Sequence, residues 1–371
     1  MAGRGGGGFV LIGIFGAGRN GTTLLMRLLD GSPGLWVYPI ELNYLTVHQP
    51  KSWRCRAARL LRGRGRGKTT FFAWAEAQVQ ELAETYLERL MDPLKVQGNP
   101  LDALRTRGYQ GSPRTDLPDY LSAMQAAYDD RHLASAPFLV FKSREVTELS
   151  QYQKMFPQMR FIHIVRHPFS NYSSLKRTDM VAKQKPFWFQ GGDILRTQLE
   201  DRWIPHVRFI MAARLADPQR HHVIKYEDLC QEPSEVITDI CRWLNVALPS
   251  DLLLQTVLGG KRMTQLPSNP SQVGVHTPPR VISNMANAFK YDEVLTERER
   301  ALILFRTYCL ARQLGYFDKE PASLPTRWQL LRAWFLPDRW ECMNTHPGLR
   351  LFRALLSRRL YIFSKLVLPS L

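Results

Sequence analysis

The stretch FVLIGIFGAGRNGTTLL, residues 9–25, decides the fold of this chain. Its apolar first part predicts a buried β-strand over residues 9–15. The glycine-rich turn GAGRNG, residues 16–21, follows, and TTLLMRLL, residues 22–29, predicts a helix. A strand, a glycine turn and a helix N-terminus together can bind an anion, because glycines allow close approach and the helix dipole favours negative charge. We therefore expect a phosphate-bearing ligand, with the Arg19 cation beside it.

Three interpretations of this turn remain open from its spacing alone. Gly16 and Gly21 match a nucleotide-binding P-loop, but Thr22 stands where that loop has its phosphate-binding lysine, which argues against ATP or GTP hydrolysis. Gly16, Gly18 and Gly21 also match the dinucleotide fingerprint of NAD(P)-binding oxidoreductases, and Glu41 follows Gly21 by twenty residues, after a predicted strand. A tight turn that binds no ligand is the third interpretation.

The composition is that of a globular protein with a large core. The chain has 371 residues, of which 44% are hydrophobic and 22% charged. Its net charge of +17 favours anionic ligands, acidic glycans, nucleic acid or a membrane surface. Residues 51–68 carry eight basic residues and no acidic one, which is typical of a solvated face. Only Trp53 could stack on bases there, so we expect no nucleic-acid partner.

Cysteine and hydropathy patterns bear on location. The cysteines are odd in number and lack CxxC spacing, which favours a reducing compartment: Cys55, Cys230, Cys241, Cys309 and Cys342. The N-terminal apolar run is too short for a signal peptide, and no run approaches twenty apolar residues. We expect a cytoplasmic protein without a metal. The basic amphipathic residues 349–363 could rest on a membrane or pack back on the protein.

Further buried strands alternate with helices along the chain. The predicted strands are residues 35–38, 138–141, 160–165 and 222–225. The predicted helices are residues 71–90, 119–130, 195–216, 233–244 and 296–314, and residues 98–118 are expected to form a loop. This alternation predicts an α/β fold, with a parallel β-sheet flanked by helices on both faces.

A second chemical signal follows the strand over residues 160–165. Arg166 leaves that strand at its carboxyl end, where open α/β sheets bind ligands. Pro168 suits the first turn of a helix, on which Ser170, Ser173 and Ser174 follow. Arginine and serine could hold a second phosphate. A surface arginine beside helix-capping serines is the alternative.

These segments together resemble the sulfotransferases that use 3′-phosphoadenosine 5′-phosphosulfate (PAPS), in the style of the carbohydrate and Golgi-type branch. The resemblance spans residues 9–317 and includes RNGTTL at 19–24, IKYEDL at 224–229 and LGY at 314–316. It implies a P-loop-containing, sulfotransferase-like three-layer sandwich in residues 1–318, with a helical and basic insertion at about 46–135. Residues 319–371 would then form a basic amphipathic extension.

The resemblance also implies residues that bind the donor. The family's R-S-G-T-T-L loop holds the 5′-phosphosulfate, and Asn20 here replaces its usual serine. That loop corresponds to Arg19, Asn20, Gly21, Thr22 and Thr23. The family's arginine and the serine eight residues later hold the 3′-phosphate. They correspond to Arg166 and Ser174, with His167 in place of the common Asp or Asn. Tyr226 would line the adenine pocket, or would be a buried tyrosine at a strand end.

The catalytic roles follow from what sulfuryl transfer needs. An acceptor hydroxyl must lose a proton, and the leaving phosphate must have its charge stabilised. The family pattern implies Glu41 as the base, Lys142 as a contact to donor and acceptor, and Arg19 as a cation on the leaving group. A rim carboxylate and a surface lysine are the alternative interpretations. His48, His206 and His276 are further candidates for the base, whereas His163 lies inside a strand and is expected to be a core residue.

We therefore expect a sulfotransferase that uses PAPS and no metal, acting on a hydroxyl of a glycan or glycolipid. An NAD(P)-binding oxidoreductase and a non-catalytic PAPS-binding protein are the alternatives. Residues 261–280 lie where the family has a flap over the donor, but its glycine-lysine-glycine signature is unclear here, so Arg280 is a weak candidate for a contact.

Overall fold

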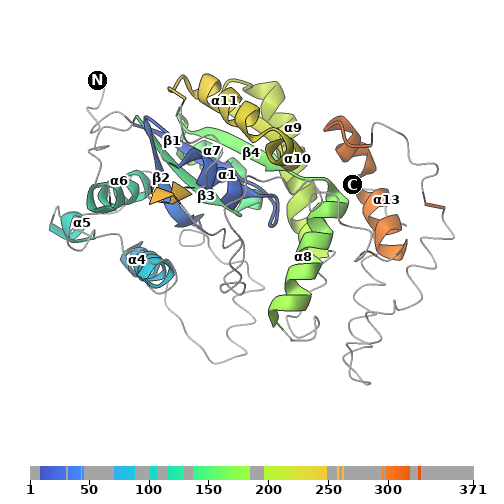
Figure 1. Ribbon diagram of the computed structural model, residues 1–371, viewed down its shortest axis with the longest axis horizontal. Coiled ribbons are helices and arrows are strands. Elements are labelled where there is room, and N and C mark those ends of the chain that lie inside the picture. Colours follow the sequence, from blue (N-terminus) through green and yellow to red (C-terminus); the bar gives the residue numbers. More distant parts are fainter. Residues whose placement is uncertain are drawn as a thin grey trace.

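The computed structural model shows an α/β protein built on one central sheet (Figure 1). The residues that the structure describes are 9–30, 32–42, 44–45, 71–87, 101–106, 116–128, 137–183, 196–248, 257–258, 261–262, 295, 297–317 and 325–326. The predicted basic run at 51–68 lies outside these residues, as do most of the proposed flap and most of the C-terminal extension.

All five strands of the central sheet are parallel, in the order β2-β3-β1-β4-β5. The strands are β1 (Val10–Phe15), β2 (Leu35–Glu41), β3 (Phe138–Ser143), β4 (Arg160–Val165) and β5 (His221–Lys225). The predicted parallel α/β sheet is therefore confirmed. A separate pair, β6 (Val257–Leu258) and β7 (Lys261–Arg262), is antiparallel.

The alternation of side chains along the strands assigns their residues to two apolar clusters. In β1, Leu11 and Phe15 belong to one cluster, whereas Ile12 and Ile14 belong to the other. The strands β2, β3 and β4 divide in the same way, because successive side chains of a strand point to opposite faces. Both faces are therefore apolar, as expected for a parallel sheet covered on both sides.

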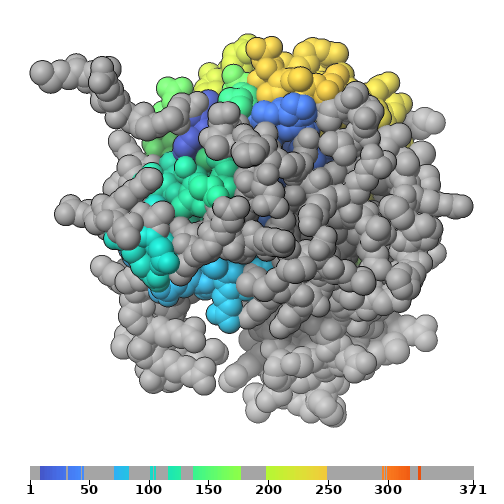
Figure 2. Space-filling view, turned by 60° about the vertical axis from the view of Figure 1, so that its left-hand side comes forward, coloured from blue at the N-terminus to red at the C-terminus, as the bar shows by residue number. Residues whose placement is uncertain are grey.

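Helices cover each of these faces. The first face, which carries Ile12 and Ile14 of β1, packs against α1 (Thr22–Leu29), α10 (Tyr226–Gln231) and α11 (Pro233–Leu244). The second face, which carries Leu11 and Phe15 of β1, packs against α4 (Phe71–Leu87), α5 (Asp102–Thr106), α6 (Asp116–Tyr128) and α7 (Leu149–Met155). In Figure 2, α4 to α6 (cyan to green) and α11 (yellow) lie on opposite sides. A 3-10 turn, Val146–Glu148, precedes α7.

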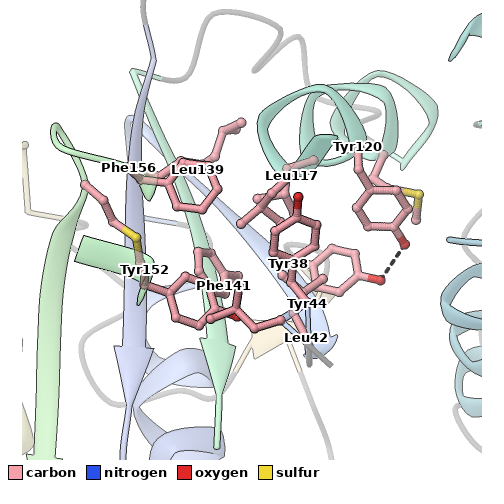
Figure 3. Close-up of a cluster of buried hydrophobic side chains, with 14 of the residues drawn as sticks. Tyr38, Leu42, Tyr44, Leu117, Tyr120, Leu139, Phe141, Tyr152 and Phe156 are labelled. Atoms are coloured by element: carbon pink, nitrogen blue, oxygen red, sulfur yellow. Dashed lines mark hydrogen bonds between the residues drawn. The ribbon is translucent and has the colours of Figure 1, made fainter. Parts of the chain in front are cut away.

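The second face carries a large aromatic core (Figure 3). Tyr38 of β2 and Tyr120 of α6 are both fully buried, and their hydroxyls are 2.8 Å apart, so each phenol has a hydrogen-bond partner inside the core. Phe15 of β1 contacts the rings of Tyr152 and Phe161 at centroid distances of 5.2 and 5.8 Å. This core fixes the strands that carry the site.

A third apolar cluster lies beside the carboxyl ends of β1 and β4. Its helices are α8 (Pro168–Lys183), α9 (Ile204–Ala216) and α13 (Glu297–Gln313), seen together in Figure 1. Ala17 and Val165 pack with Trp203 and Ile303 in this cluster. The residues after β1 and β4 are therefore held against a helical wall.

One prediction of local structure was wrong, and one predicted helix differs in type over its first part. The helix expected over residues 195–216 has a π-helical first part, η3 (Arg196–Trp203), and only Ile204–Ala216 is α-helical. The loop expected over residues 98–118 contains α5, and α6 begins at Asp116 with Pro118 in its first turn, where proline is tolerated. The polar Gly and Pro composition concealed α5 and the first turn of α6, whereas the rest of α6 lies within the helix predicted over residues 119–130.

The described residues form neither a membrane-spanning helix nor a disulfide. None of the helices they form is both long and apolar enough to cross a membrane. Cys230, Cys241 and Cys309 are free thiols, and the other two cysteines lie outside the described residues. The domain boundary at residue 318 stays a prediction.

Candidate active site

The strand order brings three strand ends together at one edge of the sheet. The strand β1 lies between β3 and β4, and the sheet extends beyond them to β2 on one side and to β5 on the other. Open α/β sheets bind ligands at such a switch of direction, outside the carboxyl ends of the strands. The glycine turn after β1, Lys142 near the end of β3 and Arg166 after β4 all lie at this edge.

The turn depends on glycine at Gly21. Its φ of +93° is left-handed, and an added Cβ would lie 2.3 Å from Cδ2 of Tyr226. Arg19 also has a positive φ, of 70°, which is uncommon outside glycine and is seen at functional sites. The helix α1 begins at Thr22 without a side-chain cap or an acidic residue in its first turn. Its first N–H groups therefore suit an anion.

A buried network of amides holds the turn in place. Asn20 donates from Nδ2 to the carbonyl of Ile164 at 2.8 Å, and its Oδ1 accepts from Asn171 Nδ2 at 2.6 Å. Gln198 of η3 donates to the carbonyl of Gly18 and to Asn171 Oδ1, both at 2.7 Å. Asparagine thus has a structural role where the family has serine. Whether Asn20 also contacts the donor stays a prediction.

The residues predicted for the donor phosphates come together around the turn. Arg19 Nε donates to Ser174 Oγ at 3.3 Å, and Arg166 Nη1 donates to the carbonyl of Arg19 at 3.0 Å. The Arg166 guanidinium lies 4.2 Å from the ring centroid of Tyr226. Burial raises the pKa of Tyr226 to about 12, although the nearby Arg166 opposes this shift. Two cations, a hydroxyl and an aromatic ring therefore meet beside the start of α1.

Residues that the sequence interpretation missed position this cluster. Trp203 of η3 donates from Nε1 to the carbonyl of Arg166 at 3.0 Å. Glu227 accepts from the backbone N–H of His167 at 3.0 Å and from the Tyr316 hydroxyl at 2.9 Å. Burial first, and then Arg166, lower the pKa of His167 to about 4, so its imidazole is neutral near pH 7. No sequence motif marks Trp203, because its partner is a backbone carbonyl.

Glu41 and Lys142 form the second half of the site. They are register partners of β2 and β3, after an irregularity that separates Val37 from Glu41. Lys142 Nζ donates to Thr23 Oγ1 at 2.6 Å and lies 3.6 Å from Glu41 Oε2. Arg144 Nε donates to Glu41 Oε1 at 2.5 Å. The predicted base and lysine are therefore adjacent to each other and to the turn.

Burial lowers the pKa of Lys142 to about 8, and the Glu41 carboxylate opposes that shift. Glu81 of α4 is a further neighbour, since burial first and then the Glu41 charge raise the pKa of Glu81. The sequence interpretation included neither Arg144 nor Glu81. Arg144 lies two residues after Lys142, a spacing that could have indicated it.

Of the three histidine candidates for the base, His206 is the one that the structure describes, and it does not enter this site. His206 is 1% exposed and its Nε2 lies 3.2 Å from Nδ1 of His163, which is fully buried, so His206 cannot reach an acceptor. His163 is the core residue that was predicted. His48, His276 and Arg280 lie outside the described residues. Among the described residues, no group of three or more His, Cys, Asp or Glu side chains could hold a metal ion.

The arrangement pairs a cationic, N–H-lined anion site with a carboxylate that faces it across Lys142. It defines an α/β protein that can bind a phosphate-bearing ligand at the edge of its sheet and accept a proton beside it. A protein-family profile described as "Sulfotransferase family" matches residues 12–250, well over half of the chain. The chain therefore belongs to the sulfotransferase family.

Several solved structures are similar to this chain, whereas no curated protein sequence matches it. The sulfotransferase domain from the curacin biosynthetic pathway is 21% identical, covers 85% of this chain and 99% of its own, and has a TM-score of 0.46. The corresponding domain of the Synechococcus PCC 7002 olefin synthase is also 21% identical, with coverages of 84% and 96% and a TM-score of 0.45. Retinol dehydratase, solved with androsterone and inactive cofactor PAP, is 13% identical, with coverages of 84% and 82% and a TM-score of 0.37.

Proposed function

We propose that this protein is an enzyme that transfers a sulfuryl group from PAPS to an acceptor hydroxyl. The observation that carries the proposal is the convergence of three parts at one sheet edge in a chain of this family. These parts are the glycine turn, the Arg166–Ser174 region and the Glu41–Lys142 pair. When bound, PAPS supplies the sulfuryl group, which the acceptor oxygen takes as adenosine 3′,5′-bisphosphate (PAP) leaves.

The donor fits the residues around the turn. The N–H groups at the start of α1 and the Arg19 cation would bind the 5′-phosphosulfate. Arg166 and Ser174 would bind the 3′-phosphate, because a guanidinium and a hydroxyl donate to the same kind of oxygen. Tyr226, whose ring contacts the Arg166 guanidinium, would line the adenine pocket. Gly21 lets the Tyr226 ring approach the turn.

Glu41 would accept the proton of the acceptor hydroxyl. Its Oε1 accepts the hydrogen bond from Arg144, whereas Oε2 has the longer contact of 3.6 Å to Lys142. Oε2 is therefore the oxygen that we expect to take the proton. Arg144 and the sheet register hold the carboxylate in place, which is what a general base requires.

Lys142 and Arg19 would stabilise the charge that develops on the leaving phosphate. Lys142 already donates to Thr23 in the first turn of α1, so its ammonium lies between the anion site and Glu41. Such a preorganised cation needs little rearrangement as charge develops. Thr22 and Thr23 would add hydroxyl donors on the same side.

For the acceptor we propose a hydroxyl of a glycan or glycolipid. The net charge of +17 supports an acidic glycan or a lipid surface. A cytoplasmic location and a membrane contact through residues 349–363 also stay predictions, as does the assignment to the carbohydrate and Golgi-type branch.

The test combines donor binding with a transfer screen. We expect the purified full chain to bind PAP in calorimetry, and to transfer radiolabelled sulfate from PAPS to at least one hydroxyl acceptor of a glycan and glycolipid panel. Binding of PAP without transfer to any hydroxyl acceptor would favour the non-catalytic PAPS-binding protein. Binding of NAD⁺ in place of PAP would favour the oxidoreductase and contradict the proposal.

A further inference from the structure

The π-helical segment η3 places Arg202 beside the site, and the proposed mechanism gives this arginine no role. Hydrogen bonds of η3 join residues five positions apart, so Gln198 and Trp203 lie on one side, with Arg202 next to Trp203. Gln198 and Trp203 are both tied to the site, through the carbonyls of Gly18 and Arg166. Arg202 therefore projects from a segment whose position over the turn is fixed.

The Arg202 guanidinium lies over the glycine turn. Its Nη1 is 3.5 Å from the position that a Cβ on Gly18 would occupy. A side chain at residue 18 would thus contact the guanidinium, and glycine leaves that space open. Arg202 is partly buried, whereas its neighbour Asp201 is exposed.

Within the described residues, Arg202 forms neither a hydrogen bond nor an ion pair. Burial lowers the pKa of Arg202, and the nearby Arg144 lowers it further, while Asp201 and Glu41 oppose the shift. Asp201 is screened by solvent, and Glu41 is already paired with Arg144. A partly buried cation thus lies near a second cation, and no residue that the structure describes gives it a hydrogen bond or an ion pair.

We infer that Arg202 and Arg144 form a subsite for a negatively charged group on the acceptor, next to the hydroxyl that Glu41 deprotonates. This inference rests on the proposed function and narrows its substrate class to acceptors with a carboxylate, sulfate or phosphate beside the reacting hydroxyl. The donor phosphates have their own cations in Arg19 and Arg166. Arg144 is instead paired with the base Glu41, and η3, which carries Arg202, contacts the 3-10 turn that follows Arg144.

Arg144 gives this subsite a second role. Its guanidinium now donates to Glu41 Oε1, and an acceptor anion would compete for the same donors. Binding of the anion therefore weakens the hydrogen bond from Arg144 to Glu41, so that the carboxylate accepts a proton more readily while its pairing in the sheet keeps it in place. An acceptor without the anion would leave that pair intact, so the subsite selects acceptors by rate as well as by affinity.

The experiment uses the full chain saturated with PAP. The probes are a tetrasaccharide that contains hexuronates and the same tetrasaccharide with its carboxylates reduced to alcohols. Calorimetry should show the wild-type protein binding the carboxylate form about tenfold tighter, as one charge-assisted contact provides. Arg202→Gln should bring this ratio close to one, and Arg202→Lys should keep part of it. Arg208→Gln, an exposed arginine on α9, is the matched control and should keep the full ratio.

Two results would overturn the inference while leaving the proposed function standing. One is PAP binding with equal affinities for the two tetrasaccharides in the wild-type protein. The other is a loss of PAP affinity in Arg202→Gln with an unchanged tetrasaccharide ratio, which would place Arg202 on the donor. A wild-type protein that does not bind PAP would instead contradict the proposed function. Thermal unfolding of each variant checks that the fold is kept.

Discussion

Two clusters of ionisable groups, one within the strand β4 and one at its carboxyl end, lie close together but differ in burial and in access to a ligand. His163 lies within the strand, and its two ring nitrogens lie 3.2 Å from His206 Nε2 and 3.0 Å from His221 Nδ1. Three residues later Arg166 leaves the strand, beside the glycine turn and Tyr226. The first cluster is sealed between Phe161 and other core rings, whereas the second lies at the sheet edge.

The position of a polar side chain along a strand therefore determines whether it is a neutral core residue or a group that a ligand can reach. His163 forms a hydrogen bond with each of the other two imidazoles. Burial is the first cause that lowers the pKa values of all three, to about 3 for His206 and about 4 for His221. They are therefore neutral core residues. Arg166 and Lys142 remain cations at the carboxyl edge, where strand ends converge and a ligand can reach them.

The largest effect should come from removing the carboxylate at the edge. Glu41→Gln cannot accept the acceptor proton, so we expect the transfer rate to fall by about 10²- to 10⁴-fold. PAP affinity should stay within about twofold of wild type, because the proposed donor contacts are elsewhere. Transfer is measured with radiolabelled PAPS and an acceptor from the screen. Glu235→Gln, on the exposed side of α11, is the control, and full activity of Glu41→Gln would rule out this base.

Removing the cation that follows β4 should act on binding. Arg166→Ala removes a proposed charge-assisted contact to the 3′-phosphate, so PAP affinity should fall by about 10- to 100-fold. Ser174→Ala should cost less, since it removes a neutral donor. Calorimetry with PAP measures both variants, and Arg214→Ala on α9 serves as the exposed control. If PAP and adenosine 5′-phosphate lose affinity equally in Arg166→Ala, the 3′-phosphate assignment fails.

The pH profile of transfer should report Lys142. Since its pKa is lowered to about 8, the ammonium that donates to Thr23 is lost as the pH rises through that value. We expect the rate to decline by about tenfold for each pH unit above 8 if the charge is essential. Lys142→Arg stays charged and should move the decline to higher pH. A profile that is flat from pH 7 to 10 in the wild type would contradict this role.

The smallest effect concerns stability and tests the sealed cluster. Buried imidazoles with lowered pKa values stay neutral in the folded protein, whereas the unfolded chain binds their protons below pH about 6.5. The free energy of unfolding should therefore fall as the pH drops from about 6.5 towards 4. Each imidazole contributes up to about 1.4 kcal/mol per pH unit.

Denaturant unfolding at several pH values measures this slope, and His206→Gln should make it shallower. An unchanged slope in His206→Gln would show that His206 is not held neutral by the fold. Transfer by this variant at pH 7.5 should match wild type if the cluster takes no part in catalysis.

Local patterns predicted the strands, the helix after the turn and the polar side chains at the strand ends. Apolar runs and glycine spacing are local properties of the sequence, so β1, the turn and α1 followed from residues 9–29 alone. Arg166 was singled out because it lies just after the end of a predicted strand, whereas Lys142 was singled out by the family pattern.

Contacts between distant segments could not be predicted in the same way. Glu41 faces Lys142 only because β2 pairs with β3, which lies about a hundred residues further along the chain. The π-helical turns of η3 place Gln198 and Trp203 for their hydrogen bonds to the carbonyls of Gly18 and Arg166. The residue pattern over the eight residues of η3 does not distinguish a π-helix from an α-helix. Arg202 was missed for the same reason.

We propose above all that the carboxyl edge of the sheet binds a donor that carries both a 5′- and a 3′-phosphate. Calorimetry of the wild-type protein with PAP, adenosine 5′-phosphate and NAD⁺ tests it most directly. We expect PAP to bind about 100-fold tighter than adenosine 5′-phosphate, since Arg166 and Ser174 would contact the additional phosphate, and NAD⁺ to bind weakly. Equal affinities for PAP and adenosine 5′-phosphate, or tighter binding of NAD⁺, would contradict it.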